Sequence, residues 1–165
     1  MSRETSLIPE EALALVGQVE SEPSVADITV LGSQRYAHAV GDLNPIYFDE
    51  EAAVAAGYRT MVAPPTYVQY ALVRTRPLGE IRDDGLFKGS SSLRLRVQRT
   101  MFGGEEWDFV VPVCTGDRIT GASRLAGLDE KQGSKGPFVR ITRETTYTNQ
   151  FGEVVARARQ IGIAR

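Results

Sequence analysis

The hydrophobic and polar positions change their period about half-way along the chain. Between Val139 and Tyr147 the odd positions, apolar at Val139, Ile141 and Tyr147, alternate with even positions that are all polar. A period of two is typical of a β-strand. Four strands are predicted in this half, over residues 107–113, 118–128, 138–148 and 154–163. Turn residues separate them at 115–117 and 149–152.

The first half has a helical pattern instead. We predict a short helix over residues 9–16, because a proline and two acidic residues open it. Residues 19–28 are expected to be irregular or an edge strand, since Pro23 interrupts them. Thr29 and Gly41 suit the start and the end of a further helix. Asp49 is the expected cap of another helix over residues 50–56, which Gly57 ends.

A further helix is predicted over residues 66–74. It is apolar on almost every side, which is typical of a buried helix. Pro65 fits its first turn, where a missing N–H costs nothing. Residues 77–92 are rich in Gly, Ser, Asp and Pro and are expected to form a long loop. We therefore predict an α+β class, a long antiparallel sheet around a central buried helix, in one domain over residues 1–165 with residues 1–8 frayed.

Composition narrows the function classes. The 19 basic and 21 acidic residues leave a formal charge of -2, so neither nucleic acid nor a membrane surface is the expected partner. The first residues lack the apolar region of a signal peptide, and no apolar run is long enough to span a bilayer. A cytoplasmic location is expected. The one cysteine, Cys114, excludes an internal disulfide and a multi-cysteine metal site, and no metal is predicted.

Residues 41–48 hold the densest candidate chemistry. They combine a Gly-Asp turn, an Asn-Pro pair and two aromatic side chains between two predicted helices. A plain connection needs only the turn residues. This stretch, Gly41-Asp42-x-Asn44-Pro45-Ile46, resembles the hydratase motif of the MaoC-like (R)-specific hydratases and dehydratases, which have the hot-dog fold.

The resemblance continues over nearly the whole chain from Thr29 onward. It includes residues 62–67, 103–106, 116–118, 143–149 and 152–158. It is closest to the N-terminal-type branch, the FAS1-like dehydratase region, which includes the non-catalytic halves of two-part (3R)-hydroxyacyl-thioester dehydratases. Such a relationship implies an acyl thioester carried on coenzyme A or phosphopantetheine, and no cofactor.

The resemblance assigns Asp42 to the acidic residue of the motif and Asn44 to its orienting neighbour. In active relatives a histidine occupies the position of Tyr47, and the Asp and His hold the water. A phenol, with a pKa of about 10, is a poor base at neutral pH compared with imidazole at about 6.5. Tyr47 can still orient a water or simply pack under the loop. Asp42 can likewise be a turn residue that binds backbone N–H groups.

The start of the predicted buried helix matches the family's site for the thioester carbonyl oxygen. There, unpaired N–H groups favour developing negative charge. The matching residues are Ala63, Pro64, Pro65, Thr66 and Tyr67. Active relatives commonly have His-Gly at the two prolines, which removes two N–H donors here. A site of this kind would have to use the N–H of Thr66 or Tyr67.

Other candidates have simpler interpretations. His38, the only histidine, can share a helix face with Asp42, but a local partner is the favoured interpretation. Cys114 is expected in the core rather than as a nucleophile. Five arginines, two of them on one predicted strand face, suggest phosphate contact or a solvated face: Arg74, Arg76, Arg94, Arg96 and Arg99. Residues 89–92 lack the lysine of a phosphate-binding loop.

Three functions remain. The favoured one is a substrate-binding subunit that pairs with a catalytic hot-dog partner, because the frame of the motif is kept while its histidine is lost. The second is a self-sufficient homodimeric enoyl-CoA hydratase or dehydratase that uses Asp42, helped by Tyr47 or His38. The third is an acyl-thioester binding module without chemistry.

Overall fold

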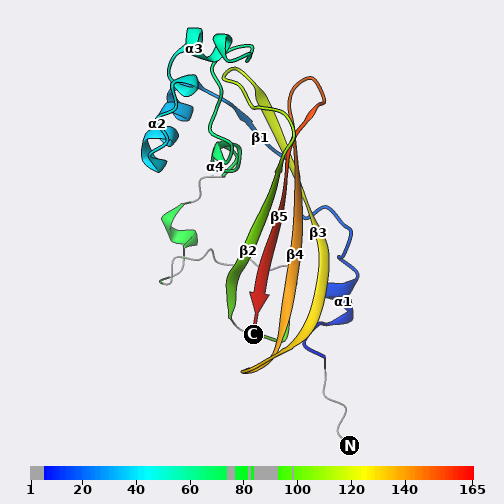
Figure 1. Cartoon of the computed structure of the whole chain (residues 1–165). Coiled ribbons are helices and arrows are strands. Elements are labelled where there is room, and N and C mark those ends of the chain that lie inside the picture. Colours follow the sequence, from blue (N-terminus) through cyan, green and yellow to red (C-terminus); the bar gives the residue numbers. More distant parts are fainter. Residues whose placement is uncertain (1–5, 74–76, 82, 84–92, 98) are drawn as a thin grey trace, which may run out of the picture.

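The centre of the molecule is a curled antiparallel sheet (Figure 1). A computed structural model describes residues 6–73, 77–81, 83, 93–97 and 99–165. Its strands lie in the order β1-β3-β4-β5-β2. They are β1 (Ser24–Asp27), β2 (Thr100–Phe109), β3 (Arg118–Gly133), β4 (Gly136–Thr148) and β5 (Val154–Ala164). The α+β class and the long antiparallel sheet are confirmed.

The helices are short and precede most of the sheet in sequence. They are α1 (Glu10–Leu13), α2 (Val30–Val40), α3 (Glu50–Ala55) and α4 (Tyr67–Ala71), with 3-10 turns η1 (Pro45–Tyr47) and η2 (Leu78–Glu80). The predicted caps are confirmed: the Thr29 side chain accepts the Gly32 N–H, and Asp49 accepts two N–H groups of α3. Gly41 ends α2 with a left-handed φ of 76°, a conformation that favours glycine.

The strand predicted over residues 107–113 is displaced in the structure. β2 begins seven residues earlier, in a stretch where a bulge between Phe102 and Gly104 breaks the strand alternation. It also ends earlier. The N–H groups of Val110 and Val111 both donate to the Val155 carbonyl, at 2.9 and 3.2 Å, so the regular ladder stops at Phe109.

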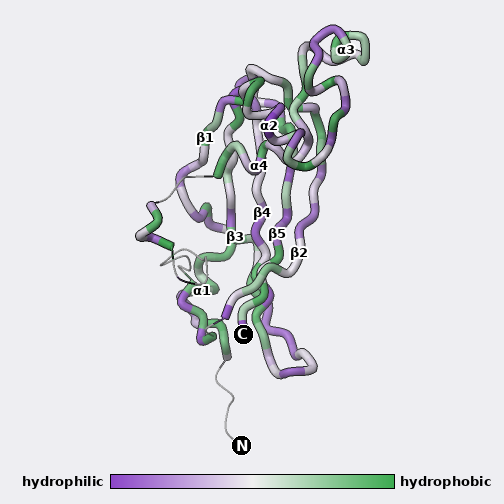
Figure 2. Tube along the Cα trace, turned by 90° about the vertical axis from the view of Figure 1, so that its left-hand side faces the viewer, coloured by the Kyte–Doolittle hydropathy of each residue, from purple (hydrophilic) through white to green (hydrophobic). Residues whose placement is uncertain are grey.

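The main core lies between α4 and one face of the sheet. Tyr67 and Val68 of α4 pack with Ile119 and with the stacked rings of Trp107 and Tyr147, whose centroids are 5.5 Å apart. Because these α4 side chains are buried against the sheet, the predicted central helix is confirmed. Hydrophobic and hydrophilic segments are interleaved along the strands (Figure 2).

Its burial on all sides is not confirmed. Tyr70 and Val73 are each 62% exposed. The sheet covers only one side of α4, and this helix spans five residues rather than the predicted nine.

A second core cluster lies at the other end of the sheet. Ile8 and Ala12 pack there with Leu93, Leu125 and Val139. Residues 6–8 are consequently not frayed: the Ser6 hydroxyl and the Leu7 N–H both donate to the Glu130 carboxylate, at 2.8 and 3.0 Å. The apolar side chain of Ile8, 8% exposed, explains why this end is fixed.

Candidate functional site

The motif loop between α2 and α3 is built from local hydrogen bonds. Asp42 Oδ1 accepts the Asn44 N–H at 3.3 Å, and the Asn44 side-chain oxygen accepts the Ile46 N–H at 3.2 Å. Asn44 thus caps η1, and Pro45 occupies its first position, where no N–H is needed. The Gly-Asp-x-Asn-Pro spacing accounts for the shape of the loop.

Tyr47 completes this arrangement. Its side chain is buried, and its hydroxyl donates to Asp42 Oδ2 at 3.1 Å. Burial, followed by the hydrogen bond to Asp42 and the charge of that carboxylate, raises the pKa of Tyr47 to about 12. The phenol therefore stays protonated at neutral pH and acts as a donor rather than a base. The structure brings Asp42, Asn44 and Tyr47 together as the motif implies, and both carboxylate oxygens of Asp42 are engaged within the loop.

An apolar cavity of about 320 Å³ adjoins the motif loop. Its wall comes from the loop, the start of α4 and the segment after β2. The lining residues are Ile46, Tyr47, Tyr58, Val62, Ala63, Pro65, Phe109, Val110, Val111, Pro112, Val113, Val155 and Ala156. Tyr47 and Tyr58 alone bring side-chain polar atoms, and no lining residue carries a charge. The cavity therefore suits an apolar group with one or two hydrogen-bonding atoms.

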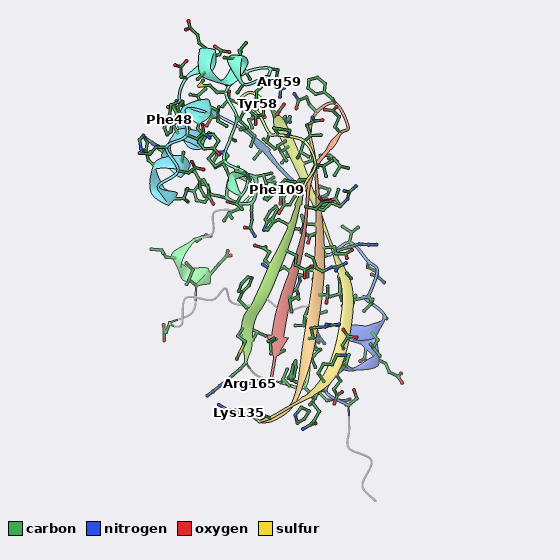
Figure 3. All side chains as sticks on the ribbon, in the orientation of Figure 1. Phe48, Tyr58, Arg59, Phe109, Lys135 and Arg165 are labelled. Atoms are coloured by element: carbon green, nitrogen blue, oxygen red, sulfur yellow. The ribbon has the colours of Figure 1, made fainter. Side chains whose placement is uncertain are left out.

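Three predicted site residues, Tyr47, Ala63 and Pro65, line this cavity, whereas Asp42 and Asn44 are exposed outside it. Tyr58 and Phe109 were missed. They lie 51 residues apart, on the loop after α3 and at the end of β2 (Figure 3). The apolar run at residues 109–113 was the sequence signal for Phe109, and it was interpreted as part of a strand, whereas no signal near Tyr58 marked it.

Two N–H groups at the start of α4 already have hydrogen-bond partners. The Ala63 N–H donates to the Val113 carbonyl at 2.8 Å, and the Tyr67 N–H to the Pro64 carbonyl at 2.9 Å. The Thr66 hydroxyl is hydrogen-bonded to the Tyr36 hydroxyl at 2.9 Å. Binding of a thioester oxygen at this position stays a prediction, and of the two N–H groups named for it Tyr67 already has a partner.

A buried carboxylate fixes the loop that carries Tyr58. Asp117, 1% exposed, accepts hydrogen bonds from the Arg59 guanidinium, the Gln150 side chain and the Cys114 N–H. The Arg59 guanidinium also lies 5.9 Å from the ring centroid of Phe151. The loop after α3 is thereby held against the turn before β3, and Tyr58 is held at the cavity.

Cys114 and His38, the other candidate side chains, have structural rather than chemical roles in the fold. Cys114 is buried, as predicted, and burial raises the pKa of its thiol, which disfavours the nucleophilic thiolate. His38 is exposed, and the centroid of its ring lies 4.9 Å from the centroid of the Phe48 ring. Among the residues that the structure describes, no group of three or more His, Cys, Asp or Glu side chains could hold a metal ion. None of the described helices has the length and apolar character needed to cross a membrane.

The arginine-rich segment does not form the predicted strand. Arg94 has a left-handed φ of 42°, and the Arg96 side chain donates to the Ser6 carbonyl at 2.8 Å. Arg99 pairs through its backbone with Arg165. The expected shared strand face of Arg94 and Arg96 is therefore wrong. Arg74, Arg76 and residues 89–92 lie outside the described residues.

Comparison with known families identifies the class. Residues 14–158 match the family described as "FAS1-like, dehydratase domain region", and the chain belongs to this family. A UPF0336 protein of Streptomyces avermitilis is 34% identical over 101 residues, which cover 61% of this chain and 62% of that protein. A protein of Thermomonospora curvata named "Probable enoyl-CoA hydratase alpha subunit" is 31% identical over 153 residues, covering 88% of this chain and 48% of that protein. The match thus spans less than two thirds of either relative.

Solved structures share the fold. The ChsH1-ChsH2 complex from Mycobacterium tuberculosis includes a chain that matches with a TM-score of 0.72 and 22% identity, over 93% of this chain and 94% of that one. The HadBC (3R-hydroxyacyl-ACP dehydratase) complex from the same organism matches with a TM-score of 0.66 and 23% identity, over 90% and 96%. The sheet and its helix are those of the hot-dog fold of MaoC-like dehydratases, as the sequence motif implied.

Proposed function

We propose that this chain is the substrate-binding subunit of a (3R)-hydroxyacyl-thioester dehydratase or trans-2-enoyl-thioester hydratase. It works with a hot-dog partner that carries the complete Asp…His motif. Its own role is to bind the acyl part of the thioester and to limit acyl length. The reaction would be the addition of water to an enoyl thioester or its reverse, without a cofactor.

The Tyr47–Asp42 hydrogen bond carries this proposal. Water addition needs a base that accepts a proton near neutral pH. Imidazole meets that need, whereas a phenol with a pKa of about 12 does not. The phenol also occupies one oxygen of Asp42, the remaining carboxylate of the motif. The frame of a hydratase site is kept, but its proton-transfer pair is replaced by a hydrogen bond.

The apolar cavity supports the binding role. It has a wall formed by Tyr47 and Ala63, so it adjoins the two segments that the family motif assigns to the reacting thioester. A methylene group transferred into an apolar site contributes about 0.8 kcal/mol, roughly fourfold in affinity. An acyl chain that enters the cavity should therefore bind more tightly with each added carbon until the cavity is full.

Related complexes support a two-chain enzyme. Two structural neighbours are complexes of two named subunits, and one relative is named as an alpha subunit. A catalytic hot-dog chain with the complete motif is accordingly the expected partner.

The test is hydration of a short-chain and a long-chain trans-2-enoyl-CoA by this chain alone and mixed with such a partner. We expect activity only in the mixture and no loss with Asp42→Asn in this chain. Tyr58→Trp, which fills the cavity, should shift the preference of the mixture toward shorter acyl chains, with Tyr70→Trp as an exposed control.

Two outcomes would replace the proposal. Activity of the chain alone that Asp42→Asn abolishes would establish the self-sufficient enzyme. Binding of enoyl-CoA without activity in either preparation would establish the non-enzymatic binding module. Tyr47→His sharpens the first outcome, because it restores imidazole to the motif position: a gain of activity in the isolated chain would show that only this side chain is missing.

A further inference from the structure

The apolar cavity beside the motif loop has two phenol hydroxyls in a wall of hydrocarbon side chains, those of Tyr47 and Tyr58. Several backbone N–H groups of the wall already donate to backbone carbonyls, at Val62, Ala63, Val110 and Val111. The two prolines of the wall have no N–H. Polar recognition by side chains in this cavity therefore depends on the two phenols.

Tyr47 can offer a ligand an acceptor but not a donor. A phenol has one hydrogen to donate and lone pairs that can accept. The hydrogen of Tyr47 is used, because its hydroxyl donates to Asp42 Oδ2 at 3.1 Å. A hydrogen bond to a carboxylate also polarises the phenol oxygen and makes it a better acceptor. The group that Tyr47 can add to the cavity is thus a lone pair.

Tyr58 brings a second phenol close to the first. Its partly buried ring packs against the cluster of Ala37, Tyr47 and Val62. After burial and Asp42, the Coulombic effect of Tyr58 is a further cause that raises the pKa of Tyr47, as expected for neighbouring phenols. Arg59, the next residue, fixes this loop through the buried Asp117 (Figure 3). Tyr58 therefore places an O–H donor beside the Tyr47 oxygen.

A donor next to an acceptor complements a hydroxyl group, which accepts one hydrogen bond and donates another. A ketone oxygen can only accept, so it would use Tyr58 and not Tyr47. A methylene group or a carbon–carbon double bond uses neither, and it would leave both phenols facing hydrocarbon. A site built to bind a hydroxyl rejects the analogue that lacks it for this reason.

We propose that Tyr58 and Tyr47 together bind a hydroxyl group of the acyl chain, Tyr58 as its donor and Tyr47 as its acceptor, so that this chain selects the hydroxyacyl thioester over the enoyl thioester. The inference rests on the proposed function, because it takes an acyl thioester as the ligand. It makes Tyr58 a specificity-determining residue, and neither phenol transfers a proton.

The test is titration calorimetry of the isolated chain with CoA thioesters of one acyl length. The ligands are the 3-hydroxyacyl, 3-oxoacyl, trans-2-enoyl and unsubstituted saturated thioesters. Tyr58→Phe and Tyr47→Phe each remove one hydroxyl and keep the ring. Tyr70→Phe makes the same change at an exposed tyrosine that does not line the cavity. The ratio of affinities is the readout, because a purely structural change would weaken all four ligands alike.

We expect the wild-type chain to bind the hydroxyacyl ligand about tenfold more tightly than the saturated or enoyl ligand, and the 3-oxoacyl ligand about threefold more tightly. Tyr58→Phe should remove most of both preferences. Tyr47→Phe should lower the hydroxyacyl preference to that of the 3-oxoacyl ligand and leave the latter unchanged. Tyr70→Phe should alter neither.

Three results would overturn the inference. The first is equal binding of all four ligands, or binding of none. The second is a hydroxyacyl preference that survives Tyr58→Phe, as it would if the Tyr58 hydroxyl donated directly to Tyr47. The third is a hydroxyacyl preference that Tyr47→Phe leaves intact, because the acceptor would then lie elsewhere.

The hydration assay with the hot-dog partner separates this inference from the proposed function. A mixture that is active while the isolated chain shows no hydroxyacyl preference overturns the inference alone. A chain with the expected preferences whose mixture hydrates no enoyl-CoA overturns the proposed function alone.

Discussion

The motif loop and the charged face of the sheet both concentrate polar side chains, but they hold them differently. In the loop, Asp42 binds partners two and five residues away. On the sheet, Arg124 and Glu144 are 20 residues apart, and Arg157 and Asp108 are 49 residues apart. Local bonds form wherever the right residues follow one another, whereas the sheet contacts depend on strand register. The loop is thus a property of its own segment, and the ion pairs on the sheet are a property of the whole sheet.

The largest expected effect comes from removing the buried carboxylate that holds the loop after α3 against the turns at one end of the sheet. Asp117→Ala removes a buried carboxylate that binds Arg59 from the loop side and Cys114 and Gln150 from the sheet side. The half-exposed Arg59 side chain can then be solvated, but the lost charged hydrogen bonds and the buried Cys114 N–H left without an acceptor should together cost about 3 kcal/mol. Urea denaturation measures the loss. Asp27→Ala, an exposed carboxylate paired with exposed Arg118, is the control and should cost about 1 kcal/mol or less.

A second prediction concerns the packing of α2, the helix that leads into the motif loop, on α4. A Cβ at Gly32 would lie 2.1 Å from the Tyr67 hydroxyl, so Gly32→Ala must displace a buried ring. We expect a loss of about 1 to 3 kcal/mol in thermal or urea denaturation. Gly32→Ala combined with Tyr67→Phe should recover part of it, because the clashing oxygen is gone. Gly79→Ala, which meets no atom within 4 Å, should change little.

A third prediction tests the local character of the motif loop. Tyr47→Phe removes the hydrogen bond to Asp42 and should cost about 1 kcal/mol. The folded pKa of Tyr47 lies above its unfolded value of about 10, so its contribution is complete below pH 10 and is lost as the pH rises toward about 12. The wild-type advantage over Tyr47→Phe should therefore shrink over that window. Ultraviolet titration should lose one late-titrating tyrosine, while Tyr147, also raised to about 12 chiefly by burial, remains.

The smallest expected effect is at Glu144, the centre of a row of ion pairs that runs from Arg124 through Glu144 and Arg159 to Glu106. Hydrogen bonds from Arg124 and then Arg159 lower the pKa of Glu144, so the folded pKa lies below the unfolded one. Its contribution is present above the ordinary value of about 4.3 and is lost as the pH falls through the lowered folded pKa. Glu144→Gln should cost about 0.5 to 1 kcal/mol at pH 7 and progressively less in acid. A cost that does not change with pH would mean that Glu144 contributes to stability through packing rather than through its charge.

Sequence reasoning succeeded where the signal lay within a few residues. The caps at Thr29 and Asp49, the end of α2 at Gly41 and the strand period of β4 were all confirmed. It failed where a distant contact decided the outcome. The bulge of β2 disguised a strand, and Ile8 anchors a terminus that was expected to be frayed.

The residues of the candidate site likewise fall into those that the sequence indicated and those that only the structure revealed. Its motif residues and the replacement of histidine by Tyr47 were apparent from the order of residues alone. The hydrogen bond from Tyr47 to Asp42 gave that replacement a chemical meaning, because burial and the carboxylate together set the pKa of the phenol. Tyr58 and Phe109 joined the site only through folding, since the segments that carry them meet through the Val62–Cys114 bridge and the Ala63–Val113 hydrogen bond.

By itself, the order of residues determined the fold class, the helix ends and the loop that replaces a hydratase dyad. These features follow from the period of the side chains and from hydrogen bonds between residues that are close in sequence. Only the tertiary structure decided which side of α4 is covered, where the apolar cavity lies, and that arginines and glutamates of four strands form one row of alternating charge across the sheet. Those features depend on the register between strands, and register is set by the packing of the whole core.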